Sequence, residues 1–426
     1  MIEWSETDEL LRTSIREFVD KEVRPHSTEL ESGELAPFDI LRRFMSTFGV
    51  DAMARDGVQQ LLEANRNAAG SQEAPERNSG SDSGAGLASA FGGSSFDGQE
   101  SLVLLAISEL AGASLGMVVS LGVSLGLTTQ TILAKGTLAQ QERWLEQLAT
   151  LEHVGAWAIT EPDSGSDALG GMRTRVTRDG DDYILTGQKT FITNGPYADV
   201  IVVFAKLDEE DGTEPRDRPV LTFVLDAGMD GLTQGPAFAK MGLRSSPTGE
   251  LFFDNVRLSR DRLLGETEPR AGGGDSSGEV KSSFTFERIG VAALALGIIN
   301  ECQRLSIDYA RNCTRWGQEI GRFQLIQLKL ARMEVARLNV QNMVFASIEQ
   351  VRSGRLPSLA EASAMKLYAA EAATEVAMEA VQLFGGNGYM TEYQVERLAR
   401  DAKSLMIYAG SNEIQVTHIA KGLLAE

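Results

Sequence analysis

The sequence predicts an α+β multidomain protein with an N-terminal helical domain, a middle β-domain and a C-terminal helical bundle. Three observations predict this fold class. Apolar residues recur at three- and four-residue spacing over residues 1–62, as expected for amphipathic helices. Residues 155–258 instead alternate, or run through β-branched and aromatic side chains, which indicates strands. Long helical segments with apolar stripes return after residue 282.

The N-terminal helical domain is expected over residues 1–153. Its composition changes between about 63 and 100, in EANRNAAGSQEAPERNSGSDSGAGLASAFGGSSFDGQE. Too few apolar side chains remain there to offset the entropy of ordering the chain, so we expect a flexible insert. Residues 110–127 are apolar enough to suggest a membrane span. Their glycines and serines favour a buried helix, so no stable membrane insertion is expected.

The middle domain is expected over residues 154–267. Strand-like runs such as DVIVVFAKLD and GELFFDNVRLS follow one another without intervening helices. This succession predicts an antiparallel sheet or barrel. A Gly-rich linker over residues 268–280 ends the domain, and the bundle is expected to occupy residues 281–426.

The charge and the cysteines exclude several classes of function. The net charge of −20 disfavours binding to nucleic acid or to anionic membranes. Cys302 and Cys313 fall in one predicted helix, roughly 16 Å apart, which is too far for a disulfide. We therefore expect free thiols and a cytoplasmic location. The three histidines are scattered, and H-E-x-x-H and C-x-x-C are absent, which argues against a metal site. We expect no serine hydrolase either.

Several short segments combine glycines with hydroxyl or aromatic side chains. Residues 155–175, GAWAITEPDSGSDALGGMRTR, expose backbone N–H groups that could hold a phosphate or the polar edge of a ring. Residues 187–195, GQKTFITNG, place an aromatic beside a Thr hydroxyl, and 382–390, QLFGGNGYM, place paired glycines at a helix end. Residues 406–416, MIYAGSNEIQV, interrupt two helices with small residues. Each segment alone is also compatible with a surface loop or a helix cap.

Taken in order, these segments resemble the acyl-CoA dehydrogenase family of flavoproteins. The resemblance rests on WAITEPDSGSD, GQKTFITNG, MGLRSS, LFFDNVRL, RWGQEIGRFQLIQLKLARM and GGNGYMTEYQVERLARDAKSLMIYAGSNEIQ. It covers nearly the whole chain apart from roughly 63–100 and 268–279. It implies an N-terminal helical domain, a middle antiparallel β-barrel and a C-terminal four-helix bundle. It also implies dehydrogenation of an acyl-CoA thioester, with an α-proton passing to a base and a β-hydride to FAD.

The resemblance further implies a homotetramer, or a heteromer with a family member, and an electron-transferring flavoprotein as electron acceptor. FAD is expected between barrel and bundle, with a neighbouring subunit completing the site. The residues implied for cofactor binding are Trp157, Ile159, Thr160, Gly165, Ser166, Phe191, Thr193, Arg315, Phe323, Gln324, Gln382, Leu383, Phe384, Gly385, Gly386, Ser411, Asn412 and Glu413. Those implied for the substrate are Ser166, Thr285, Arg288, Tyr408 and Gly410.

The reaction needs a base, which many family members carry directly after the Tyr of the C-terminal turn. Here Ala409 follows Tyr408, and a methyl group cannot take a proton. Isovaleryl-type and some long-chain-type members place the Glu on the first bundle helix instead, immediately before an Arg. Glu287, followed by Arg288, matches that arrangement. Glu287 is therefore the predicted catalytic base, and Glu413 is assigned to the cofactor.

One position departs from the family pattern. Members usually carry an Arg that contacts the FAD diphosphate of another subunit where this chain has Cys313. Either Arg315 or Arg311 substitutes for that Arg, or FAD is held more weakly. Two alternatives therefore stay open: a non-catalytic subunit that pairs with another family member, and a flavin oxidase or monooxygenase on the same scaffold.

Overall fold

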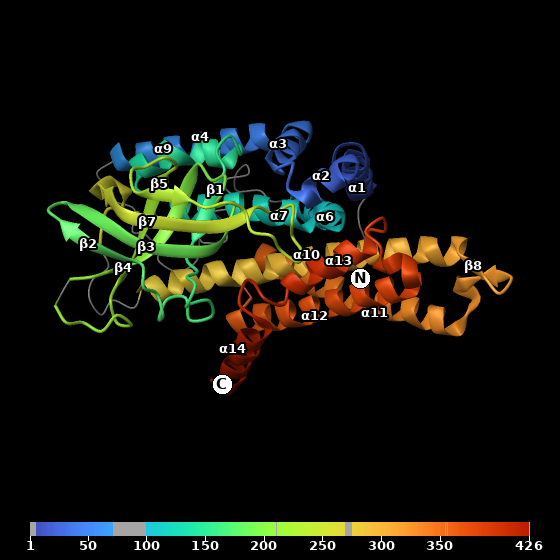
Figure 1. Cartoon of the computed structure of the whole chain (residues 1–426). Helices are drawn as coiled ribbons and strands as arrows, with labels where there is room; N and C mark the ends of the chain where they lie inside the picture. Colours follow the sequence, from blue (N-terminus) through green and yellow to red (C-terminus); the bar gives the residue numbers. More distant parts are fainter. Residues whose placement is uncertain are drawn as a thin grey trace.

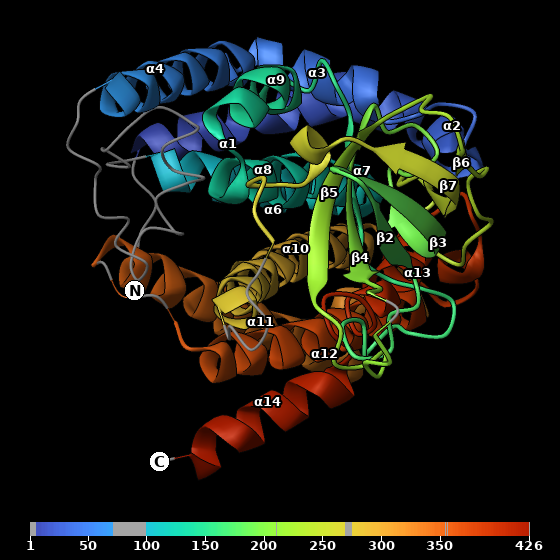
Figure 2. The same cartoon turned by 90° about the vertical axis from the view of Figure 1, so that its left-hand side faces the viewer.

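The computed structural model describes residues 6–70, 99–209, 211–268, 275–353, 355 and 357–425. Helices, then strands, then helices follow one another along the chain (Figure 1). In Figure 2 the N-terminal helices occupy the top of the molecule and the C-terminal helices the bottom, with the sheet to one side. This arrangement confirms the predicted fold class.

The N-terminal helices pack on two different partners. α1 and α7 contribute Ile15 and Leu115 to a core that is shared with the C-terminal helices. α4 and α9 instead place Val58 and Leu148 against the sheet. The bounds are α1 Glu6–Phe18, η1 Val19–Val23, η2 Arg24–His26, α2 Ser27–Ser32, α3 Phe38–Thr47, α4 Val50–Gly70, α6 Gln99–Ala113, α7 Leu115–Leu121, η3 Gly122–Thr129, α8 Gln130–Lys135 and α9 Leu138–Ala149.

The middle domain is a curled sheet with the strand order β1-β4-β2-β3-β7-β6, and β5 pairs with β4. Most neighbours are antiparallel, but β1 and β2 both pair with β4 in parallel. The prediction of an antiparallel sheet or barrel is wrong for these two pairs, because β2 and β3 lie between β1 and β4 in the chain and no hairpin joins β4 to β1 or β2. The bounds are β1 Gly155–Ala158, β2 Arg175–Asp179, β3 Asp182–Thr193, β4 Val200–Leu207, β5 Val220–Asp226, β6 Leu232–Gln234, β7 Thr248–Leu258 and η4 Arg260–Arg262.

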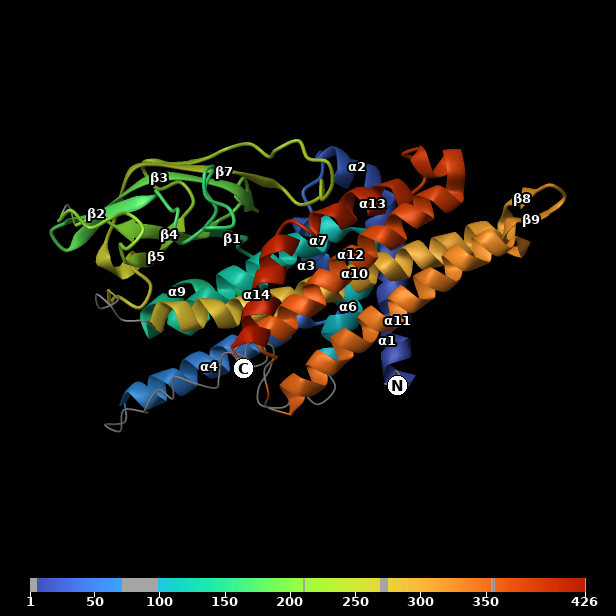
Figure 3. The same cartoon turned by 90° about the horizontal axis from the view of Figure 1, so that it is seen from below.

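Long helices form the C-terminal domain, and α10, α11 and α12 run side by side in Figure 3. A reciprocal capping box between Ser358 and Glu361 starts α12. α14 leaves the others and ends near the C-terminus. The bounds are α10 Asp275–Asn312, β8 Thr314–Arg315, β9 Gln318–Glu319, η5 Ile320–Arg322, α11 Gln324–Arg352, α12 Leu359–Phe384, η6 Gly385–Tyr389, α13 Val395–Ser404 and α14 Asn412–Leu424.

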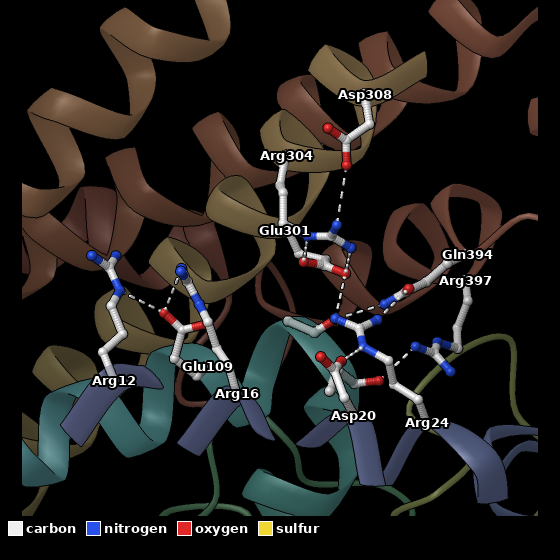
Figure 4. A network of polar contacts seen from close by, with 12 residues as sticks. Arg12, Arg16, Asp20, Arg24, Glu109, Glu301, Arg304, Asp308, Gln394 and Arg397 are labelled. Atoms are coloured by element: carbon white, nitrogen blue, oxygen red, sulfur yellow. Dashed lines mark hydrogen bonds and ion pairs between the residues drawn. The ribbon is translucent and has the colours of Figure 1, made fainter. Parts of the chain in front are cut away.

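Ion pairs fasten the N-terminal helices to α10 (Figure 4). Glu301 accepts hydrogen bonds from Arg24 at 2.9 Å and from Arg304 at 2.8 Å. Burial would raise the pKa of Glu301, but Arg304 and Arg24 hold it below its usual value. Arg24 also donates to Gln394, just before α13, at 2.9 Å. The position of α10 is therefore set by charged contacts as well as by apolar packing.

The MGLRSS segment joins the sheet to both helical domains. The backbone N–H of Leu243 donates to the buried carboxylate of Asp401 on α13 at 2.7 Å. The hydroxyls of Ser245 and Ser114 lie 2.8 Å apart, which ties the same segment to the start of α7. The three domains therefore meet at this loop.

Two predicted boundaries are wrong. α4 continues through Gly70, so residues 63–70 are helical rather than flexible. Asn65 and Arg66 bond to Gln141 and Glu142 of α9 at 3.1 and 2.6 Å, contacts that local composition does not reveal. Likewise α10 begins at Asp275, inside the predicted linker. The rest of the expected insert, 71–98, and residues 269–274 of the linker lie outside the described residues.

The apolar stretch predicted as a buried helix begins at the end of α6 and continues through α7 and η3. By length and composition alone, Leu115–Lys135 is apolar enough to cross a membrane. Here η3 contacts β1 and α9, and Met117 and Val118 are buried in the core shared with the C-terminal helices. Its packing is that of a core helix.

Candidate active site

The turn between α13 and α14 has a left-handed backbone conformation at two consecutive residues. Ala409 has a φ of 54° and Gly410 a φ of 77°. A Cβ atom on Gly410 would lie 2.8 Å from Nε2 of Gln415. That amide donates to the carbonyl oxygens of Ala409 at 3.0 Å and Gly410 at 2.7 Å. A positive φ is costly for Ala, so these hydrogen bonds hold a strained turn in place.

A buried lysine from α12 lies behind this turn. Lys366 has no exposed surface, and its Nζ donates to the carbonyl oxygen of Gly410 at 2.8 Å and to Oδ1 of Asn412 at 3.1 Å. Burial, together with the nearby charge of Arg288, lowers the pKa of Lys366 to about 8. The turn is therefore held from two sides, by α14 and by α12.

Glu287 lies on α10 close to these cations and is half-buried. Burial raises the pKa of Glu287 to about 7, and the charges of Arg288 and Lys366 offset only part of the penalty. Within the described part of the chain, no hydrogen bond contributes to the pKa of this carboxylate. Arg288 is buried, and its Nε donates to Oε1 of Gln415 at 2.7 Å. A carboxylate with a pKa near the working pH is suited to general base catalysis.

The rest of the turn offers polar atoms to a ligand. Among the described residues, Oη of Tyr408 and Nδ2 of Asn412 are buried without a hydrogen-bond partner. Thr285, two residues before Glu287, is also buried. Buried polar atoms normally have partners, so a polar ligand that supplied them would be stabilised here.

Glu413, the rival carboxylate, has a different environment. It is exposed in the first turn of α14, which Ser411 precedes. Its own backbone N–H and the Ser411 side chain hold the pKa of Glu413 below its usual value. An exposed carboxylate that stays ionised is a weaker base than one with a raised pKa.

In the middle domain, a buried ion pair fastens the 159–166 loop from within. Glu161 accepts Nζ of Lys189 at 2.8 Å and the backbone N–H groups of Arg173 and Thr174 at 2.6 and 2.9 Å. Lys189 also donates to the carbonyl oxygen of Ile159 at 3.1 Å. The loop that carries Thr160, Gly165 and Ser166 is therefore rigidly anchored to β3.

The outer surface of this loop and the end of β3 are open. Gly165 and Ser166 are exposed, and a Cβ atom on Gly165 would meet nothing within 4 Å. Phe191 is 67% exposed and has a φ of 57°, at an irregularity in the β3–β7 pairing. Thr193 ends β3 and is half-buried. An exposed aromatic in a strained conformation is a candidate ligand contact.

Two predicted residues have side chains that pack against the protein itself. The indole Nε1 of Trp157 donates to Oγ1 of Thr131 at 3.2 Å, and its ring meets that of Phe204 with centroids 4.8 Å apart. Ile159 is buried in the same core, between the sheet and the N-terminal helices. Their side chains are therefore committed to packing.

The other predicted cofactor residues surround a groove of about 740 Å³ at the β8–β9 end of α10. Arg315 lines this groove together with Cys313, whereas Arg311 does not. A Cβ atom on Gly385 or Gly386 would meet nothing within 4 Å, and Gln382 is exposed beside them. The further predicted residues that line the groove are Phe323, Gln324, Leu383, Phe384, Gly385 and Gly386.

The predicted site residues thus form two groups at opposite ends of the molecule. In Figure 1 the sheet and the start of α10 lie on the left, while β8 lies at the far right. Along the helix rise, Glu287 and Cys313 are separated by roughly 40 Å. One small-molecule cofactor cannot bridge that distance within one chain.

Three residues of the site were not singled out by the sequence: Lys189, Lys366 and Gln415. A signal for Lys366 was present, since it is a charged residue within the apolar helix SLAEASAMKLYAAEAATEVAMEAVQLF. A buried charge needs hydrogen-bond partners, so a lysine at a core position predicts a polar contact in the interior. For Lys189 and Gln415 the sequence pattern offers no comparable signal.

Models of three domains match the chain from residue 83 onward: acyl-CoA dehydrogenase N-terminal domain at residues 83–152, middle domain at 156–256 and C-terminal domain at 278–424. An acyl-CoA dehydrogenase of Bacillus subtilis (strain 168) is 34% identical over 417 residues, covering 97% of each chain. The structure of butyryl-CoA dehydrogenase from Megasphaera elsdenii is 31% identical with a TM-score of 0.80, covering 100% of both chains. A glutaryl-CoA dehydrogenase from Mycobacterium smegmatis, in complex with FADH2, is 26% identical with a TM-score of 0.78, covering 99% of this chain and 96% of that one.

Proposed function

Because this chain belongs to the acyl-CoA dehydrogenase family, we propose that it oxidises the α,β carbon–carbon bond of an acyl-CoA thioester to the trans-2-enoyl-CoA, with FAD as cofactor. The observation that carries the proposal is the setting of Glu287. Its pKa of about 7 belongs to a half-buried carboxylate facing two cations, next to a turn where Ala409 supplies no acid. It is the group best suited to accept the α-proton.

The residues present fit the cofactor. In the middle domain, Thr160, Ser166 and the exposed ring of Phe191 offer hydroxyls and an aromatic surface to a flavin. The orphaned Nδ2 of Asn412 is a donor that a cofactor or substrate oxygen would satisfy. When bound, FAD supplies the two-electron acceptor for the β-hydride.

Different residues of the chain accept the proton and position the substrate. Glu287 takes the α-proton, a role that typically accelerates a reaction by about 10²–10⁴-fold. Arg288 and Gln415 fix the start of α14 against α10 through a 2.7 Å hydrogen bond. The small 408–413 turn lets the thioester approach backbone groups, and the orphaned Oη of Tyr408 is available to it. Orienting the substrate against a fixed base supplies the remaining acceleration.

The separation of the two groups of cofactor residues favours an oligomer. Since the groove around Arg315 lies far from Glu287, we assign it to the cofactor bound by a neighbouring subunit, in a homotetramer. Leu325, Leu328 and Val335 leave an apolar stripe exposed along α11, as expected for a face that another subunit covers. Arg315 then stands in for the Arg that Cys313 replaces.

The proposed electron acceptor follows from the family, and the proposed location from the two free cysteines, Cys302 and Cys313. One structural neighbour is an electron-transferring flavoprotein of Acidaminococcus fermentans, 28% identical with a TM-score of 0.76. We propose an electron-transferring flavoprotein as the acceptor of this enzyme's electrons, a role in fatty acid β-oxidation, and a cytoplasmic location.

Anaerobic flavin bleaching tests the proposal. Purified protein should be yellow, and its flavin absorbance should fall on addition of one member of a panel of short, branched, long and steroid-side-chain CoA thioesters. A colourless protein that responds to none of them would support the non-catalytic subunit. Hydrogen peroxide or an oxygenated product, formed as fast as substrate is consumed in air, would instead support the oxidase or monooxygenase alternative.

A further inference from the structure

Lys366 is among the largest fully buried side chains of the described residues, and no carboxylate hydrogen-bonds to it. Its partners are one backbone carbonyl, that of Gly410, and one amide oxygen, that of Asn412. Burying an ammonium group without a directly bonded carboxylate is costly. The other buried residues of α12 are alanines, larger apolar residues and Ser363, so the helix could carry Leu or Met at position 366 at no such cost.

We propose that Lys366 is a positioning residue of the reaction, which holds the 408–413 turn in its strained form and keeps a cation beside Glu287. This inference rests on the proposed function, because it assigns Lys366 to the environment of the base. The group does not touch the reacting atoms itself. It acts through the turn and through its charge.

The geometry forms a continuous chain of hydrogen bonds. Arg288 on α10 donates to Gln415 on α14, which donates to the carbonyl oxygens of Ala409 and Gly410. Lys366 on α12 donates to the same Gly410 carbonyl from the other side. Three helices are thereby joined at a turn that has two consecutive positive φ angles. Without Lys366, one of these helices would no longer hold the turn.

The charged groups around Glu287 also support this role for Lys366. Arg288 on α10 and Lys366 on α12 are the charged groups that lower the pKa of Glu287. Tyr408, in the turn, is neutral, because burial and the charge of Glu287 raise its pKa. Glu413 on α14 faces Lys366 and Lys403 from the solvent side. Asp401 on α13 acts on Tyr408 rather than on Glu287.

A catalytic carboxylate has to meet two opposite requirements: it must be ionised at neutral pH, and it must remain basic enough to accept a proton. A carboxylate desolvated by burial would stay protonated at neutral pH and could not accept an α-proton. A directly bonded lysine would have the opposite effect, since it would hold the carboxylate ionised and weaken it as a base. Lys366 does neither, because its hydrogen bonds go to Gly410 and Asn412 and only its charge reaches Glu287.

The test compares Lys366→Met and Lys366→Gln with the wild type over pH 5.5 to 9. Met fills the space without charge or hydrogen bonds, and Gln keeps a donor for Gly410 without the charge. Both should move the acid limb of the kcat profile about one pH unit upward, with turnover about tenfold lower at pH 6 and nearly normal at pH 9. Met should also raise KM, because the turn loosens, whereas Gln should not.

Lys403→Met is the matched control. Lys403 is an exposed lysine of α13 near the same turn, and it acts on Glu413 rather than on Glu287. Its removal should leave the acid limb where it is in the wild type.

A second readout does not depend on turnover. Infrared difference titration of the Glu287 carboxyl band, identified by its loss in Glu287→Gln, should show the same upward shift in both Lys366 variants. An unshifted band and an unshifted acid limb would overturn the inference. So would variants that never fold with flavin, because Lys366 would then be a folding residue only. If the wild type turned over no thioester, the proposed function would fail, while the infrared titration would still decide the role of Lys366.

Discussion

Two buried lysines, Lys189 in the sheet and Lys366 in the bundle, face carboxylates in opposite ways. Lys189 donates directly to Glu161 at 2.8 Å, and two backbone N–H groups complete that carboxylate's partners. Lys366 gives its hydrogen bonds to Gly410 and Asn412 instead, and leaves Glu287 only its charge. Burial lowers the pKa of both lysines to about 8.

The two carboxylates respond in opposite directions. Burial would raise the pKa of Glu161, but the charge and hydrogen bond of Lys189 hold it below its usual value. Burial raises the pKa of Glu287 to about 7, because no direct hydrogen bond offsets the lost solvation of its ionised form. Glu161 therefore serves as a structural anion that anchors a loop, whereas Glu287 is available for proton transfer. The difference lies in direct hydrogen bonding, not in burial or in the presence of a nearby lysine.

The largest expected effect is that of Glu287→Gln. The amide keeps the size of the side chain but cannot accept a proton, so turnover should fall about 10²–10⁴-fold. Flavin content and the spectral change on binding a thioester should stay close to those of the wild type. Steady-state turnover and flavin absorbance measure both. Turnover close to that of the wild type would show that Glu287 is not the base, and the functional difference between Glu161 and Glu287 would then be refuted.

Breaking the buried ion pair between Glu161 and Lys189 should lower the stability of the protein rather than its turnover. Lys189→Met leaves Glu161 buried without its counter-charge, which should lower the free energy of unfolding by about 3 kcal/mol. The double variant Glu161→Gln/Lys189→Met should recover part of the loss, because no lone charge remains. Urea unfolding followed by circular dichroism measures this. If the single and double variants were equally stable, the pair would not be acting as a buried ion pair.

The two carboxylates should also affect the pH dependence of stability with opposite sign. The pKa of Glu287 is raised to about 7 in the folded state, so wild-type stability is lost as pH rises from its unfolded value of 4.5 through 7. Glu287→Gln should therefore match the wild type at pH 4.5 and be more stable at pH 8, by on the order of 1 kcal/mol after solvent screening.

Glu161 should show the reverse. Its folded pKa is lowered, so its contribution is present above the unfolded pKa of 4.5 and is lost as pH falls through the folded value. Glu161→Gln should destabilise the protein at pH 8 and do so less as the pH falls below 4.5. Melting temperatures of both variants across this range test the pair of predictions. Parallel curves for the two would contradict the assigned roles.

The smallest effect is expected from Glu413→Gln. Glu413 is exposed at the start of α14, where a carboxylate interacts with the helix N-terminus by about 0.3–1 kcal/mol. Losing that interaction should loosen the start of α14, where the cofactor is expected to bind. Flavin affinity should therefore weaken about two- to fivefold, and the acid limb of the kcat profile should not move. Flavin titration and the pH profile measure the two quantities. A displaced acid limb would mean that Glu413, and not Glu287 alone, sets the protonation state of the site.

The sequence predicted the coarse fold because the signals for it are local. The change from helical to alternating periodicity near residue 154, and back after 281, needs no tertiary contact to be visible. The parallel pairing of β1 and β2 with β4 was not predictable in this way, because register between distant strands depends on the whole sheet. The helical state of residues 63–70 was missed because contacts with α9, such as that of Asn65 with Gln141, stabilise a segment whose own composition is weakly helical.

Residue types at fixed spacing were enough to identify the family, the three-domain order and Glu287 as a candidate base. Contacts between distant elements were needed to show that Trp157 faces a core, that Arg315 rather than Arg311 lines the far groove, and that Lys366 stands behind the turn. They were needed because a side chain's solvation and partners come from elements distant in sequence. The pKa of about 7 that suits Glu287 to the proposed role of base is therefore a property of the folded chain, although the residue itself can be found in the sequence.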